Sequence, residues 1–73
     1  MDYSSLLTND QKRSILEQRI AQFALEGYQH TLNKEVAGNS PESVAAADDA
    51  LAILDNAITV HQEELAKLPA PTV

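Results

Sequence analysis

One heptad repeat spans most of the C-terminal half of this 73-residue chain. Its positions alternate in steps of three and four residues, and all but one of them are apolar. The series is Val44, Ala47, Leu51, Leu54, Ile58, His61, Leu65 and Leu68. A strand would alternate every second residue, so this spacing predicts a long α-helix with a continuous apolar stripe. Another helix has to cover that stripe, because a surface helix buries its apolar face.

A helix that could serve as this partner is predicted upstream, over about residues 9–36. Thr8 and Gln11 have the spacing of a capping box, in which each side chain accepts a hydrogen bond from the other residue's backbone amide. Asp10 follows in the first turn, where the helix dipole favours a negative charge. The downstream helix is predicted over about residues 41–68, because Ser40 is a good N-cap and Pro41 suits the first helical position.

The two predicted helices are separated by a short break at residues 37–40. Gly38 suits the left-handed conformation that commonly ends a helix. Stop and start signals this close together predict a tight turn between antiparallel helices. The sequence therefore predicts an all-α fold, an antiparallel two-helix hairpin that associates into a helical bundle or docks on a larger assembly.

This hairpin divides the chain into three parts. Residues 1–8 form an N-terminal arm, residues 9–68 form the hairpin with its turn at 37–40, and residues 69–73 form an extended tail with two prolines. The arm holds three large apolar residues, Tyr3, Leu6 and Leu7. We expect the arm to pack on the hairpin or on a neighbouring subunit, although a frayed terminus is the alternative.

The hairpin contact uses one apolar seam on each helix. The predicted seam consists of Leu16, Ile20, Phe23, Gly27, His30, Val44, Ala47, Leu51, Leu54, Ile58, His61 and Leu65. Folding at the turn pairs residues whose numbers sum to about 77, which sets Leu16 level with His61. The same register places Arg13 beside Glu64 as a weak surface ion pair. Gly27 lies within the seam, where its missing side chain would let the other helix approach closely.

Each helix also carries a second apolar series that the hairpin contact does not use. This second interface consists of Ala21, Leu25, Tyr28 and Leu32, followed by Val36, on the first helix and Ala46, Ala50, Ile53, Ala57 and Val60 on the second. Soluble monomers rarely expose apolar patches of such length. A short chain without cysteine also needs a source of stability other than disulfides. We therefore expect a homo-oligomer, docking on a larger structural protein, or both.

The charge distribution excludes several other partners. The net charge is −6, from eleven acidic and five basic residues. Nucleic-acid binding depends on phosphate contacts from a basic face, which these scattered bases do not form. A membrane-surface helix would also carry Lys or Arg on its polar face. No apolar run is long enough to cross a bilayer and no signal peptide is recognisable, so we expect neither membrane insertion nor secretion.

Patterns that would support chemistry are sparse. Glu26 with His30, and His61 with Glu64, share a helix face and could contribute to a carboxylate–histidine metal site. The hairpin separates the two histidines, so they could converge only between subunits. The alternative is a seam histidine that hydrogen-bonds across an interface, which would make assembly sensitive to pH.

The sequence also lacks a glycine-rich phosphate loop and an activated nucleophile beside a base. We therefore predict no catalytic, cofactor-binding or metal-binding residues, no small-molecule substrate and no enzymatic activity.

Several stretches resemble small proteins encoded by tailed bacteriophages. They are Gln-Lys-Arg-Ser-Ile-Leu-Glu-Gln-Arg-Ile-Ala-Gln at 11–22, Tyr-Gln-His-Thr-Leu-Asn at 28–33 and the alanine-rich helix ending in Ile-Thr-Val-His-Gln-Glu-Glu-Leu. The resemblance implies an accessory part of a virion or an assembly factor. The hairpin is also similar in architecture to the Rop family of RNA-binding dimers, whose basic face this acidic chain lacks.

The leading expectation is a non-enzymatic structural or accessory subunit of a larger assembly, such as the capsid or tail of a bacteriophage virion. The alternative is a cytoplasmic homodimeric regulatory module that masks a partner protein. A third hypothesis, an acidic mimic of DNA, is weaker because the carboxylates are scattered. We expect the chain in a virion or in the host cytoplasm.

Overall fold

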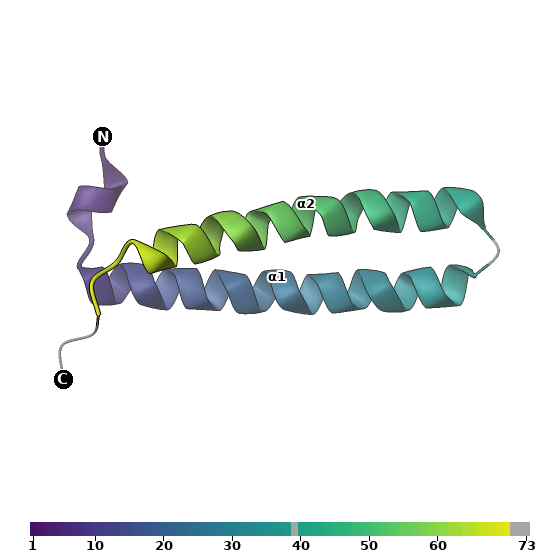
Figure 1. Cartoon of the computed structure of the whole chain (residues 1–73), viewed down its shortest axis with the longest axis horizontal. Coiled ribbons are helices and arrows are strands. Elements are labelled where there is room, and N and C mark those ends of the chain that lie inside the picture. The colour runs from purple at the N-terminus through teal and green to yellow at the C-terminus, as the bar shows by residue number, and fades with distance from the viewer. Residues whose placement is uncertain (39, 71–73) are drawn as a thin grey trace.

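The computed structural model describes residues 1–38 and 40–70 of the chain. Helices α1 (Asn9–Ala37) and α2 (Pro41–Ala66) lie side by side in opposite directions, after a short 3-10 helix, η1 (Tyr3–Leu6) (Figure 1). The N-terminal arm and the end of α2 lie at the same end of the molecule, opposite the turn (Figure 1). The predicted all-α hairpin is confirmed. The predictions for Asn39 in the turn and residues 71–73 of the tail lie outside the described residues.

The first turns of both helices are capped by the side chains predicted from the sequence. The Gln11 amide donates to the Thr8 hydroxyl over 3.1 Å, and the Thr8 amide donates to the Gln11 side-chain oxygen over 2.9 Å. This reciprocal pair is the predicted capping box. At the start of α2, the Ser40 hydroxyl accepts from the Ser43 amide over 3.4 Å and Pro41 stands in the first turn. The predicted N-caps are confirmed.

Gly38 ends α1 with φ of +47° and ψ of −75°. The positive φ is a conformation that favours glycine, as the sequence suggested. The prediction of a left-handed helical cap is nevertheless wrong, because that region has ψ near about +45°. Only residues 38–40 connect the helices, and the observed angles resemble those of a tight γ-turn. The Gly38 amide still donates to the Lys34 carbonyl over 3.2 Å and so completes the last helical turn.

The seam between α1 and α2 buries little. Within the described residues, only Ala47 and Leu54 are buried, with 7% and 9% of their surface exposed. The other predicted seam residues are half-buried: Leu16, Ile20, Phe23, Gly27, His30, Val44, Leu51, Ile58, His61 and Leu65. Two helices cover one stripe on each other, so the side chains along that stripe stay open at both edges.

The hairpin is an elongated rod of 50 × 29 × 14 Å with a radius of gyration of 16.1 Å. A compact domain of this length has a radius of gyration near 11 Å, by the scaling of about 2.2·N^0.38. The accessible surface is 5581 Å², whereas a compact monomer of the same mass exposes about 4,400 Å². The hairpin alone therefore exposes about 1,200 Å² that a compact fold would bury.

The contacts between the helices lie at or somewhat above the predicted register, in which residue numbers sum to about 77. A Cβ atom at Gly27 would lie 3.9 Å from Leu51, and these numbers sum to 78. The numbers sum to 80 for Arg19 with His61 and to 84 for Phe23 with His61. A helical side chain leans toward its own N-terminus and covers the surface about one residue before its Cα atom, so that in an antiparallel pair the two leans together raise the sum by about two.

The register also removes the predicted ion pair between Arg13 and Glu64. Arg13 instead pairs with Asp10 at 3.0 Å and donates to the Pro69 carbonyl. Glu64 pairs with Lys67 at 2.9 Å. Arg13 thereby holds the chain after α2 against the first turns of α1.

The arm packs less than expected. Asp2 caps η1 by accepting from the Ser4 amide over 3.0 Å. Tyr3 and Leu6 are exposed, and only Leu7 approaches the hairpin. Tyr3 and Leu6 thus do not pack on their own hairpin, and packing of the arm on a neighbouring subunit stays a prediction.

Candidate functional site

His61 lies in a cluster that ties α2 to α1 across the seam. Arg19 Nε donates to His61 Nε2 over 2.9 Å, and His61 Nδ1 lies 2.6 Å from the Ala57 carbonyl oxygen. Because Nε2 accepts a hydrogen bond, the neutral ring carries its proton on Nδ1 and donates it to the carbonyl. Both ring nitrogens have partners in the chain, and the contact that the sequence suggested for an interface lies within one hairpin.

Phe23 completes this cluster. Its ring meets the His61 ring edge to face, with centroids 4.9 Å apart and planes at 73°. The Arg19 guanidinium carbon stands 5.3 Å from the Phe23 ring centroid. Arg19 thus combines a hydrogen bond to one helix with a cation–π contact on its own helix. Sequence reasoning missed Arg19, although its spacing of four residues from Phe23 was a usable signal.

The two histidines do not form a joint site. His30 is half-buried on α1, in the half nearer the turn, while His61 lies in the half nearer the open end. Across residues 1–38 and 40–70, neither Glu26 with His30 nor Glu64 with His61 forms an ion pair. In the same part of the chain, no three metal-ligating side chains converge on one point.

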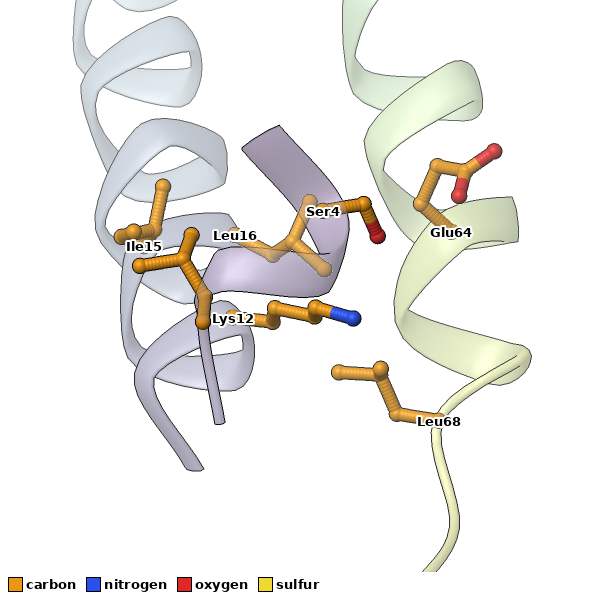
Figure 2. Close-up of a pocket in the computed structure, with 7 residues that line it drawn as sticks. Ser4, Lys12, Ile15, Leu16, Glu64 and Leu68 are labelled. Carbon is orange, nitrogen blue, oxygen red and sulfur yellow. The ribbon is translucent and has the colours of Figure 1, made fainter. Parts of the chain in front are cut away.

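The grooves along the seam are shallow. One pocket of about 230 Å³ opens where the arm crosses the hairpin, and in Figure 2 the Lys12 side chain extends from α1 toward α2 across it. Its lining is Ser4, Leu7, Lys12, Ile15, Leu16, Glu64 and Leu68. A second hollow of about 570 Å³ lies near the turn, beside Lys34 and Leu51. Both are open places where a two-helix seam is uncovered. The first has Ser4, Lys12 and Glu64 among its lining residues, and the second has Thr31, Lys34 and Glu35.

The second apolar series of α1 faces away from α2. Leu25, Tyr28 and Leu32 are exposed by 50%, 65% and 45%, and Val36 by 88%. At 3.6 residues per turn these positions lie about 150° around the helix from the seam. We call Ala21, Leu25, Tyr28, Leu32 and Val36 the α1 outer face.

The series on α2 is placed differently. Ala50 and Ala57 are half-buried at the margin of the hairpin contact, whereas Ile53 is 70% exposed. Ala46 and Val60 are also exposed. This series lies about a quarter turn from the α2 seam, on a broad side of the hairpin, while the α1 outer face occupies a narrow edge. The second interface expected from the sequence is therefore two separate surfaces.

Neither series contains a charged position. The α1 series can be extended toward the N-terminus through Gln18 and Ser14, and none of its positions from Ser14 to Leu32 is charged. Exposed acids flank both surfaces, Glu17 and Glu35 on α1 and Asp49 and Glu63 on α2. The α1 outer face carries more large exposed apolar side chains, Leu25, Tyr28, Leu32 and Val36, against Ile53 and Val60 on α2.

No protein-family model matches the chain, and no curated protein or solved structure is significantly similar to it. Neither helix of the described part is long and apolar enough to cross a membrane. The functional argument therefore depends on the fold and its surfaces.

Proposed function

We propose that this chain is a non-enzymatic structural or accessory subunit whose core is completed by packing against other protein. The observation that carries this proposal is the thin core. Within the described residues two side chains are buried, Ala47 and Leu54, and about 1,200 Å² is exposed beyond what a compact monomer shows. A protein interface of standard size buries about 800 Å² on each partner, so this excess is enough for one such interface.

The shape supports a structural role over a catalytic one. The chain is elongated, with dimensions of 50 × 29 × 14 Å, and the two grooves described along the seam are open to solvent. The exposed apolar stripes along this elongated chain are suited to binding between larger subunits, where each stripe would pack against a helix or a groove of a neighbour. The resemblance to small bacteriophage proteins favours a virion, in its capsid or its tail, as the assembly.

The proposal is tested by counting copies in particles. Particles are purified by density gradient from cells that carry the gene, and the chain is quantified by mass spectrometry against isotope-labelled peptides of its own sequence. We expect many copies per particle, in fixed ratio to a capsid or tail protein. A chain that stays in the soluble extract while particles form normally would overturn the proposal and favour the regulatory module.

A further inference from the structure

We propose that the chain binds a second copy of itself through the α1 outer face, with the two α1 helices antiparallel across a two-fold axis. This inference rests on the proposed function, because it names one surface through which the subunit associates.

The spacing on the outer side of α1 is that of a second coiled-coil seam. Steps of four and three residues alternate along Ser14, Gln18, Ala21, Leu25, Tyr28 and Leu32. The steps match the a and d positions of a heptad, whose side chains pack into the holes of a facing helix. Helix α1 thus carries one seam for α2 and another, on nearly the opposite side, that nothing in the hairpin covers.

The charge of this surface fits a second copy. A two-fold contact brings identical surfaces together, so any charge within it meets its own kind or lies close to it. Two copies of a chain with a net charge of −6 repel each other. Because no position of the series from Ser14 to Leu32 is charged, two copies can meet along it without placing like charges of the series in contact. Glu17 is the acid nearest its start, and an antiparallel arrangement keeps its two copies at opposite ends.

The sizes of the side chains favour the antiparallel arrangement. The small members of the series lie in its N-terminal half and the large ones in its C-terminal half. Antiparallel pairing about the middle sets Leu25 against Ala21, Tyr28 against Gln18 and Leu32 against Ser14, so that each large side chain meets a smaller one. Parallel pairing would stack the tyrosines on each other and leave gaps between the serines.

The exposed surface of the chain leaves room for such a contact. The chain exposes about 1,200 Å² beyond a compact monomer of its mass, and an interface of standard size removes about 800 Å² from each partner. Because the α1 outer face occupies an edge of the hairpin, an α1-to-α1 contact leaves the broad sides open to a larger protein.

The test is sedimentation equilibrium on the full chain from micromolar to millimolar concentration, with helicity followed by circular dichroism. We expect a dimer that loses helicity as it dissociates. Leu25→Glu should weaken dimerisation about a hundredfold, the size of effect typical for a central interface residue. Ile53→Glu adds the same charge at an exposed apolar position on α2 and should leave dimerisation unchanged.

Other results would overturn the α1 contact, self-association or the proposed function. A dimer weakened by Ile53→Glu and not by Leu25→Glu would overturn the α1 contact, as would a trimer. A chain that remains monomeric and poorly helical would overturn self-association and leave the proposed function standing with another protein as partner. A monomer that unfolds cooperatively at every concentration would overturn both. Mixing Leu25→Glu with Ala21→Lys should restore association, and failure of the mixture would exclude the antiparallel arrangement.

Discussion

Arg19 donates from Nε to Nε2 of His61, a residue 42 positions further along the chain, over 2.9 Å. This bond joins α1 and α2 at one level of the seam, where a guanidinium with a rigid fork of donors meets an imidazole that offers one acceptor in the plane of its ring. The same guanidinium lies over the Phe23 ring. One side chain therefore contacts both helices.

Arg19→Met should lower the free energy of unfolding by about 1–2 kcal/mol, because it keeps the apolar stem and removes both the hydrogen bond and the cation–π contact. The measurement is urea unfolding at one fixed protein concentration. Lys67→Met removes the same charge from an exposed ion pair with Glu64, and it should change the free energy of unfolding less than Arg19→Met does. Equal effects of the two substitutions would refute the role given to Arg19.

The two glycines should respond to alanine in opposite directions. A Cβ atom at Gly27 would lie 3.9 Å from Leu51 Cδ2, an ordinary contact distance, so Gly27→Ala should stabilise the hairpin by about 0.5–1 kcal/mol. Gly38 has a φ of +47°, and Gly38→Ala should destabilise the hairpin by about 1–2 kcal/mol. Thermal unfolding of both variants beside the wild type measures the two signs. If Gly27→Ala were destabilising, the close packing of the two helices at this position would require a residue without a side chain.

Alanine substitutions at two neighbouring residues of α2 should have different effects on stability, because one residue lies in the seam and the other faces solvent. Leu54 is 9% exposed and Ile53 is 70% exposed. Leu54→Ala should cost about 2–3 kcal/mol of unfolding free energy, since it removes the most buried large side chain of the described hairpin. Ile53→Ala should cost less than about 0.5 kcal/mol, within the range of surface changes. Comparable losses at the two positions would mean that α2 is rotated relative to the structure.

Glu64 raises the pKa of the Lys67 ammonium above its ordinary value, first by accepting its hydrogen bond and then by its negative charge. A raised pKa in the folded chain means that this pair stabilises the end of α2 at neutral pH and that the contribution is lost as pH rises through that pKa. The ¹³Cε chemical shift of Lys67 measures the titration. Glu64→Gln should shift the midpoint back toward that of an ordinary lysine, and an unchanged midpoint would show that the pair does not form in solution.

The sequence predicted the elements of this fold because their ends carry local signals. Thr8 with Gln11, and Ser40 with Pro41, act through bonds within four residues, so their effect can be recognised without the rest of the chain. The heptad spacing likewise predicted which face of each helix meets the other. These features depend on the 3.6-residue period and on caps, which are the same in any context.

The details that failed depend on contacts between distant residues. His61 meets Arg19 and Phe23 across the seam, and only a three-dimensional view of both helices supplies these contacts. The ψ angle of Gly38 follows from the geometry of the short connection and not from the glycine alone. The division of the second interface into an edge and a broad side follows from how the helices are rotated against each other.

The small buried core of the hairpin also has a consequence for how many copies of the chain persist in a cell. With two buried side chains in its described part, an unassembled hairpin should open often and expose its backbone to proteases. In the proposed assembly, other protein would cover these stripes and the hairpin would open rarely. Unassembled chains would then be degraded, while assembled chains would persist. The number of copies would therefore follow the number of binding sites in the assembly, without separate control of synthesis.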